Sequence, residues 1–548
     1  MPKKLLLVHP KTPPSFWGME YALEIARLSA SNPPLGLITV AALTPPDWEV
    51  ALVDENVEPV DLDAACDVVG IGAMNVQARR AFELADAFRQ RGRTVVIGGP
   101  LTFSHARRCA PHADVVVVGE AERTWPRFCA DYAAGRQAPI YLETEPVDMA
   151  LSPVPRYDLL VPHAYAAIPI QSSRGCPHNC EFCDIIVMLG RRVRTKSVEQ
   201  VMAEVDAVAA TGTDSIFFTD DNFNGNLKYV RAMLNALIEK RRLTGYAPLL
   251  FTQASVDLAE QDDLLELMVR AGFTRLFLGV ETPNQAALRE ANKRQNLHGN
   301  LLDRIHKLQR AGLVTWAGMI VGFDHDTPDI FAEQAEFLDQ AGIAMAMVGL
   351  LNAVPRTALY ERLQRERRLI ETTEEGDNCA WTNIVPKQMS RAELFRGYAD
   401  LLSHLYDQRN YTRRLLKNIF NMQPAQSGQT ASRPPSLADL ADMFRAIWYF
   451  TWRRDPVYRR HFVPNLLRVA CRRFSRVVEA CVHLGIWPHF DRYVPRVREA
   501  LERGALLEAV QQVHLLAPPL AAGAKREPLA AEIPLPPAVE RAFTEAAK

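Results

Sequence analysis

The sequence lacks the features that would place it in a membrane or outside the cell. Its 548 residues contain no apolar run of about 18 residues, the length that a membrane-spanning helix needs. The start, "MPKKLLLVHP", has an apolar run too short for the core of a signal peptide and predicts a first β-strand. Cysteine is scarce, with 9 in the chain. No disulfide framework is therefore expected, and the cytoplasm is the expected compartment.

The sequence also lacks an excess of charge of either sign, and it lacks a dinucleotide-binding motif. The formal net charge is -1, so there is no bulk attraction to nucleic acid and no such partner is expected. No G-x-G-x-x-G occurs, which argues against a bound dinucleotide. The chain is 48% hydrophobic and 23% charged, as ordinary globular proteins are, and its length predicts about three or four domains.

Three of the few cysteines lie close together, in "RGCPHNCEFC" at 174–183. Cys176, Cys180 and Cys183 have C-x3-C-x2-C spacing, which is too tight for unrelated residues of a loop. A structural zinc site wants four ligands in two paired knuckles, but no second C-x2-C exists and His178 lies inside the motif. An iron–sulfur cluster fits better, because clusters are held by closely spaced thiolates. Three thiolates leave one iron of a 4Fe–4S cluster open to a substrate or cofactor.

This motif, with Phe182 directly before its third cysteine, resembles the signature of the radical S-adenosylmethionine (SAM) superfamily. The resemblance implies a partial (β/α)6 barrel. It further implies that SAM chelates the open iron and that one electron from the cluster cleaves SAM to a 5'-deoxyadenosyl radical. A flavodoxin- or ferredoxin-type protein is the implied electron donor.

The segment from about 165 to 370 alternates between strand-like and helix-like runs. The strand-like runs are "AIPIQSSRGC", "SIFFTDDNF", "PLLFTQASVD", "RLFLGVET", "VTWAGMIVGF" and "AMAMVGLLNAV". Such alternation predicts a parallel βα architecture. In these barrels the polar residues at the carboxyl ends of the strands form the active site. The rule selects Asp220, Asp221, Asn222, Ser255, Asp257, Glu281 and Asp324.

Three of these runs are similar to SAM-contacting segments of the superfamily. "TDDNF" resembles the segment near the SAM amino group, and "GVET" the segment near the ribose. "GMIVGF" is similar to the G-x-I-x-G-x-x-E pattern near the adenine, but position 325, where the final acid would stand, is His. The contacts to SAM that the resemblance implies are Phe182, Asp220, Asp221, Ser255, Glu281, Gly318, Ile320 and Gly322.

The first 145 residues form a separate α/β pattern. The runs "KKLLLVHP", "WEVALVDEN", "DVVGIGAM", "RTVVIGGP" and "ADVVVVGEAE" alternate with helical stretches, which predicts a Rossmann-like, doubly wound sheet. Placed before such a barrel, this unit resembles the cobalamin-binding domain of one large radical SAM subclass; a degenerate domain that binds nothing is the alternative. The implied contacts to cobalamin are Asn56, Gly72, Gly98, Gly99, Gly119 and Glu120.

The turn "VDENVEP" lacks a histidine. In cobalamin mutases and methionine synthase, the histidine of D-x-H-x-x-G is the lower ligand of cobalt. Many members of the radical SAM subclass also lack it. Cobalamin is therefore expected to bind base-off, with no histidine below the cobalt.

The remaining segments complete the predicted organisation. A linker is expected at 146–164, the barrel at 165–370, a mainly helical domain at 371–515 and an Ala- and Pro-rich tail at 516–548. Eight arginines and one acid lie between Arg453 and Arg476, interleaved with apolar residues. This pattern fits either a basic amphipathic helix on an anionic membrane or the solvated face of a helical domain.

The arrangement most resembles cobalamin-dependent radical SAM enzymes of the hopanoid C-2 methylase type. The resemblance implies C-methylation of an unactivated carbon, with one SAM remethylating cobalamin and a second supplying the radical. The apolar and aromatic C-terminal helices predict a large, mainly apolar, lipid-like substrate. Two alternatives remain: a radical rearrangement, cyclisation or ring contraction without methyl transfer, and a non-catalytic cobalamin and iron–sulfur sensor.

Overall fold

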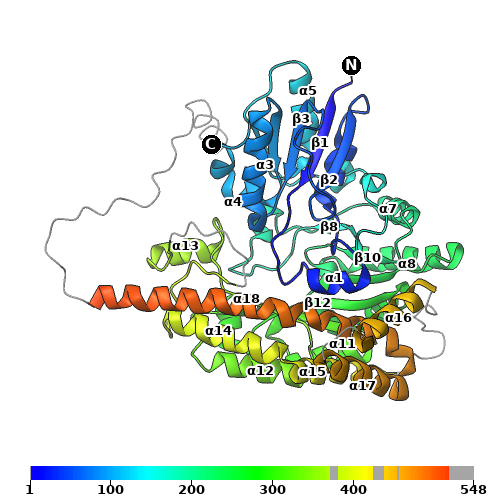
Figure 1. Ribbon diagram of the computed structural model, residues 1–548, viewed down its shortest axis with the longest axis vertical. Coiled ribbons are helices and arrows are strands. Elements are labelled where there is room, and N and C mark those ends of the chain that lie inside the picture. The colour runs from blue at the N-terminus through cyan, green and yellow to red at the C-terminus, as the bar shows by residue number, and fades with distance from the viewer. Residues whose placement is uncertain (1, 371–379, 424–436, 453–455, 517–548) are drawn as a thin grey trace.

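The computed structural model describes residues 2–370, 380–423, 437–452 and 456–516. Figure 1 shows the N-terminal sheet stacked on the barrel, with the C-terminal helices on the far side of the barrel. All but the first residue of the tail expected at 516–548 lies outside the described residues.

The N-terminal domain is a six-stranded parallel sheet in the order β2-β1-β3-β4-β5-β6. Its strands are β1 (Lys4–His9), β2 (Glu49–Asp54), β3 (Val68–Gly72), β4 (Thr94–Gly98), β5 (Val115–Val118) and β6 (Ile140–Leu142). The five predicted runs each form one strand. The sixth strand, β6, is only three residues long and was not predicted from the sequence.

Helices cover both faces of this sheet, which confirms the doubly wound prediction. They are α2 (Leu35–Leu43), α3 (Ala78–Gln90), α4 (Pro100–Cys109) and α5 (Ala121–Ala133). Phe88 of α3 and Leu101 of α4 pack in one core cluster. Leu37 of α2 and Phe128 of α5 pack in another, on the opposite face. Because both faces are buried, the strands are continuous apolar runs without alternation.

The second sheet is the partial barrel, with six parallel strands in the order β14-β13-β12-β11-β10-β7. Its strands are β7 (Ile168–Ile170), β10 (Ser215–Phe218), β11 (Leu249–Ala254), β12 (Phe273–Glu281), β13 (Val314–Val321) and β14 (Ala346–Leu350). The intervening helices are α7 (Val198–Ala210), α8 (Leu227–Thr244), α9 (Asp262–Ala271), α10 (Gln285–Glu290), α11 (Leu301–Arg310) and α12 (Ile330–Ala341). The predicted barrel fold is confirmed.

Side chains alternate along the barrel strands between the helix-covered face and the interior. The helix-covered face is fully buried, whereas the interior positions Phe217, Phe251, Phe277 and Met347 are only half-buried. The Phe217 and Phe251 rings stack at 4.3 Å. The interior of the barrel is therefore lined mainly by apolar side chains that remain partly exposed, with Gln253 and Arg275 on the same face.

The C-terminal helices close one side of the barrel. They are α13 (Ala358–Arg365), α14 (Arg391–Tyr406), α15 (Gln408–Asn421), α16 (Leu437–Trp452), α17 (Pro456–Arg472) and α18 (Val477–Leu516). From α14, the hydroxyls of Tyr398 and Tyr406 donate to the carbonyls of Val348 and Ala346, at 2.6 and 2.7 Å. Through these hydrogen bonds α14 covers the edge strand β14. In the described part of the chain, no helix is both long and apolar enough to span a bilayer.

Candidate functional site

The three cysteines of the motif lie on one loop between β8 (Ser173–Arg174) and α6 (Ile185–Met188). Two amide side chains from other elements point at their sulfurs. Asn222 Nδ2 lies 3.8 Å from Cys176 Sγ, and Gln295 Nε2 lies 3.8 Å from Cys180 Sγ. None of the three thiols is in a disulfide.

The electrostatics of the three thiols fit a cluster that supplies positive charge. Burial raises the pKa of Cys176 and Cys180, and raises that of Cys183 to about 12, while Lys293 acts in the opposite direction at each. Thiolates thus require a bound cation here. Among the described residues, no group of three His, Cys, Asp or Glu side chains could hold a single metal ion. The donor set suits a cluster, in which each thiolate binds its own iron.

Asp220 and Asp221 hold the segment that leads into the loop. Asp220 is completely buried and accepts hydrogen bonds from the Ser172 and Ser173 amides, at 2.7 and 2.9 Å. Asp221 accepts from the amide of Gly175, next to the first cysteine, at 2.7 Å. Burial raises the pKa of Asp221 to about 6. Both carboxylates position the loop, and their contact with SAM stays a prediction.

Ser255 belongs to a polar network beside the loop. Its hydroxyl donates to Asp257 at 2.6 Å and lies 3.5 Å from His178 Nε2. Its amide donates to Asn222 and Asn224. The predicted residues Asn222, Ser255 and Asp257 are thus brought together at the carboxyl ends of β10 and β11. Asp257 bonds to Asn224 as well, so it is not an isolated solvated carboxylate.

Glu281 ends β12 in a strained conformation. Its φ is +65°, in a region that residues other than glycine rarely adopt and that often marks a functional site. Its carboxylate pairs with the buried Lys293 at 2.6 Å. A Cβ on Gly279 would lie 2.8 Å from both charged groups, so a side chain there would have to displace this ion pair. Lys293 and Gln295 carry no sequence signal, and both were missed.

Of the three predicted positions in this segment, Gly318 and Ile320 lie on β13 and Gly322 follows it directly. A Cβ on Gly318 would lie 3.0 Å from the Phe277 ring. Ile320 packs in one apolar cluster with Phe182 and Phe323. Gly322 has a φ of +108°, and its amide donates to Asp326. Burial raises the pKa of Asp326 to about 7.

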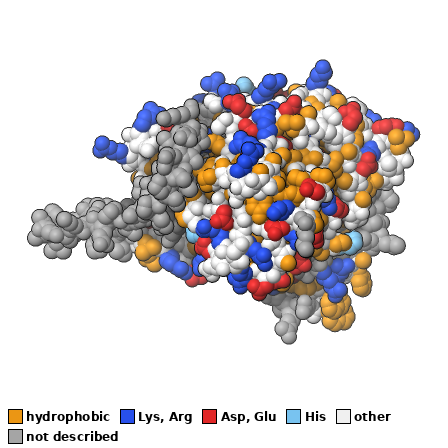
Figure 2. Space-filling view, turned by 90° about the horizontal axis from the view of Figure 1, so that it is seen from above, with side chains coloured by type: hydrophobic (Ala, Val, Ile, Leu, Met, Phe, Trp, Pro, Cys, Tyr) orange, Lys and Arg blue, Asp and Glu red, His pale blue; other side chains and the backbone are white. Residues whose placement is uncertain are grey.

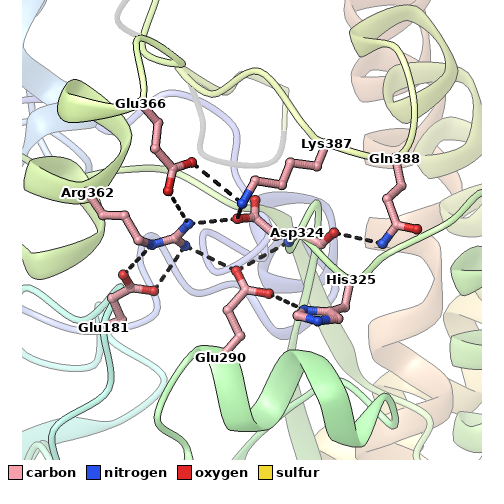
Figure 3. Close-up of a pocket in the computed structure, with 8 residues that line it drawn as sticks. All are labelled: Glu181, Glu290, Asp324, His325, Arg362, Glu366, Lys387 and Gln388. Carbon is pink, nitrogen blue, oxygen red and sulfur yellow. Dashed lines mark hydrogen bonds and ion pairs between the residues drawn. The ribbon is translucent and has the colours of Figure 1, made fainter.

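Asp324, also predicted at this strand end, is neither a solvated loop residue nor a helix cap. It pairs with Arg362 at 2.7 Å, Arg368 at 2.6 Å and Lys387 at 2.8 Å. Together they hold the pKa of Asp324 well below its usual range, despite its burial. Asp324, Arg362 and Lys387 line an open cleft of about 530 Å³ (Figure 3), together with Glu181, Glu290, His325, Glu366 and Gln388.

Arg362 of α13 ties this cleft to the cysteine loop. Its guanidinium makes a two-pronged pair with Glu181, at 2.6 and 3.1 Å, and a single pair with Glu290 at 3.1 Å (Figure 3). Glu181 lies between the second and third cysteines. Its amide donates to Ala291, and its carbonyl accepts from the Leu359 amide. The C-terminal region therefore fixes the position of the loop.

Replacing Arg362 by alanine is expected to lower the iron retained per chain and the rate of SAM cleavage. Groups that orient metal ligands commonly contribute about 10- to 100-fold to metal affinity or activity. Arg362→Lys keeps the charge but loses the planar fork, so an intermediate loss is expected. Iron analysis and the EPR spectrum of the reduced protein measure the effect. Arg365→Ala, an exposed arginine on the same helix, is the control. Equal iron contents in both alanine variants would disprove this role.

The predicted cobalamin residues lie at the carboxyl edge of the first sheet. Close packing accounts for three of the glycines without any ligand. A Cβ at Gly72 would lie 2.7 Å from Leu37, one at Gly99 would lie 2.9 Å from Ala73, and one at Gly119 would lie 2.8 Å from Glu143. At Gly98 the nearest atom would be 3.8 Å away.

The same edge presents both an apolar and a polar group to a ligand. Met74, two residues after the end of β3, is 56% exposed, which suits the apolar face of a macrocycle. Asn56 stabilises the turn after β2, since its side chain bonds to Asp54 and to the Thr12 amide. His9 is the imidazole at this edge, bonded to the Gly72 carbonyl, and burial lowers its pKa. The base-off binding mode and the cobalamin contacts stay predictions.

Glu120 does more than line this edge, because it joins the two domains. It pairs with Arg174 at 2.6 Å and Arg194 at 3.0 Å, and accepts from the Val147 amide. Arg174 also pairs with Glu122 at 2.8 Å, and it precedes the first cysteine by two residues. This buried cluster holds the carboxyl edge of the first sheet against the cysteine loop. The sequence did not indicate these pairs.

A Rossmann-like sheet whose carboxyl edge faces a three-cysteine loop on a partial barrel defines a cobalamin-binding radical SAM enzyme. Family models agree: B12 binding domain at 25–128, radical SAM superfamily at 170–338, and a domain of unknown function at 357–503. The cofactors are therefore a 4Fe–4S cluster, SAM and cobalamin, and the sensor alternative is set aside.

Two curated relatives and one solved structure are similar over most of the chain. An uncharacterized methyltransferase of Synechocystis is 36% identical over 505 residues, 91% of this chain and 93% of the relative. The hopanoid C-2 methylase of Rhodopseudomonas palustris is 30% identical, over 74% of this chain and 81% of that protein. The radical SAM methyltransferase TsrM from Kitasatospora setae shares the fold, with a TM-score of 0.58 and 15% identity, over 91% of this chain and 100% of that chain.

The chain belongs to the cobalamin-binding radical SAM family of methyltransferases. More distant relatives extend to other reactions. An anaerobic magnesium-protoporphyrin IX monomethyl ester cyclase of Rubrivivax gelatinosus is 25% identical, over 60% of this chain and 63% of the cyclase.

Proposed function

We propose that this enzyme methylates an unactivated carbon of a large, mainly apolar substrate. The proposal rests on one observation, that an edge of the first sheet faces the open mouth of the barrel. The carboxyl ends of the first sheet, where cobalamin would bind, meet the mouth of the barrel, where SAM would bind. A substrate between them can meet both a radical and a methyl donor.

Contacts on several sides of the two edges support this arrangement. The pairs of Glu120 with Arg174 and Arg194 lie on one side. On another, Tyr165 donates to Asp54 at 3.2 Å. The Arg356 guanidinium lies 4.6 Å from the centre of the Phe103 ring. The two domains are thus held in a fixed orientation, as a reaction between two cofactors requires.

The side chains at the mouth support the class of substrate. Phe182 and Ile320 are half-buried, and the interior of the barrel beneath them carries Phe217, Phe251 and Phe277. An apolar wall of this kind binds apolar ligands and excludes water from a reactive radical. The bound cofactors supply the radical and the methyl group. The chain itself binds them, orients them and keeps the site dry.

The electron donor and the compartment complete the proposal. A flavodoxin- or ferredoxin-type protein supplies the electron, and the reaction takes place in the cytoplasm. A 4Fe–4S cluster on the three cysteines, which are partly or fully buried, takes its electron from such a donor.

The reaction is tested with SAM that carries a deuterated methyl group. The holoenzyme is incubated with reductant and with candidate lipids or natural-product precursors. We expect a product that gains the label, together with 5'-deoxyadenosine and S-adenosylhomocysteine. The cyclase relative makes a reaction without methyl transfer the second candidate. A product that forms along with 5'-deoxyadenosine but gains no label would replace C-methylation by that candidate.

A further inference from the structure

The helix α16 is apolar on two opposite faces. One face is buried, with the Phe450 ring stacked on Phe462 of α17 at 4.2 Å. The other face carries Phe444, Trp448 and Trp452, at i, i+4 and i+8, and these are 70%, 50% and 79% exposed. A helix that is apolar all round is normally buried. The outer face of α16 is therefore expected to bind a partner.

The neighbouring helix α17 adds positive charge and further apolar groups. Its sequence contains no Asp or Glu, while Arg459, Arg460, Arg468 and Arg472 are all exposed. Leu467 is 60% exposed, and Phe474, just after the helix, is 80% exposed. The exposed charges of α17 are thus of one sign, whereas the sequence of α16 contains Asp439, Asp442 and Arg445. By contrast, acidic and basic side chains are intermixed on the face of the molecule shown in Figure 2.

Exposed tryptophan beside arginine is the composition of protein surfaces that lie in the headgroup region of a bilayer. Indole rings are favoured at the membrane–water interface. Arginines are drawn to anionic headgroups while their stems cover apolar surface. A binding site for a protein helix would need a groove, whereas these side chains project from convex helices.

We propose that the α16–α17 hairpin docks this enzyme onto the surface of an anionic lipid bilayer. Phe444, Trp448 and Trp452 enter the headgroup region, and the arginines of α17 pair with lipid phosphates. The hairpin lies on the surface and does not span the bilayer. The inference concerns where the enzyme binds and is independent of the reaction that it catalyses.

Vesicle flotation of the holoenzyme tests the proposal without any turnover. The probes are phosphatidylcholine vesicles with and without phosphatidylglycerol. The wild type is expected to float with the anionic vesicles and to dissociate as salt is raised, because salt screens the arginines. The triple variant Phe444→Ser/Trp448→Ser/Trp452→Ser should bind at least about ten-fold more weakly. Arg459→Gln/Arg460→Gln should lose the preference for anionic lipid.

Leu243→Ser is the matched control, because Leu243 of α8 is 67% exposed but lies outside the hairpin. It should bind vesicles as the wild type does. Quenching of tryptophan fluorescence by brominated lipid, in the wild type but not in the triple variant, would support insertion of the stripe. The proposal is overturned if the wild type fails to float, or if the triple variant floats equally well. It is also overturned if, without lipid, the wild type is an oligomer and the triple variant is a monomer. Phe444, Trp448 and Trp452 would then bind a second copy of the chain.

Discussion

Replacing Cys176, Cys180 and Cys183 together by alanine is expected to remove the iron–sulfur cluster and all cleavage of SAM. Each cluster iron that the chain holds would lose its thiolate. The fold should survive, because burial raises the pKa of the three thiols and their removal leaves no charge unpaired. Iron and sulfide analysis, the EPR spectrum after reduction, and the yield of 5'-deoxyadenosine are the measurements. All three should fall to background.

The exposed Cys471 provides the control. Cys471→Ala should keep the full iron content and the wild-type rate. The far-UV circular dichroism of the triple variant should match that of the wild type, which separates loss of the cluster from loss of the fold. Full iron retention in the triple variant would show that these cysteines are not the ligands.

Arg174→Ala is expected to cost about 3–5 kcal/mol of stability, as breaking a buried ion pair does. The arginine side chain is 13% exposed, and its partners Glu120 and Glu122 are 8% and 2% exposed. Without the arginine, Glu122 keeps a buried charge with no cation beside it. Urea unfolding measures the loss, with amide hydrogen exchange showing which domain opens first. The first opening should occur between the N-terminal sheet and the cysteine loop, with a parallel loss of iron.

A matched surface pair distinguishes this effect from the loss of any arginine. Arg156 pairs with Asp158 at 2.7 Å, but their side chains are 43% and 62% exposed. Arg156→Ala should therefore cost less than about 1 kcal/mol. If the two variants lose the same stability, Arg174 does not join the domains.

The cost of Arg174→Ala also depends on pH. Burial raises the pKa of Glu122, but Arg174 outweighs it, so the net pKa is below the ordinary value. A carboxyl with a lowered pKa stabilises the fold above its unfolded pKa, and this contribution is lost as pH falls through the folded value. In Arg174→Ala burial alone would dominate and raise the pKa of Glu122, so the difference between the two proteins should shrink as pH falls, beginning above the ordinary glutamate value of about 4.3 and continuing down to the lowered pKa of the wild type.

Local patterns in the sequence were sufficient to predict the two sheets. The alternation of apolar runs and helical stretches predicted β1 to β5 and the six barrel strands, which are eleven of the twelve strands in the two six-stranded sheets of the described residues. In these two sheets β6 was missed, because three residues give too short a run. The cysteine spacing predicted the cluster loop, because the three cysteines are neighbours in the chain. The strand-end rule selected Asp220, Asp221, Ser255 and Glu281, because parallel strands bring their carboxyl ends to one edge, and their contacts to SAM stay predictions.

Only the tertiary structure decided which charges meet. Glu120 was predicted to contact cobalamin, yet it pairs with Arg174 and Arg194, 54 and 74 residues away. Arg362 meets Glu181 across 181 residues, and no periodicity signals such a pair. A charged side chain in a sequence has many candidate partners of opposite sign. Which one it meets depends on how the elements pack, because Coulomb attraction between groups is strong only at short distance and in buried surroundings.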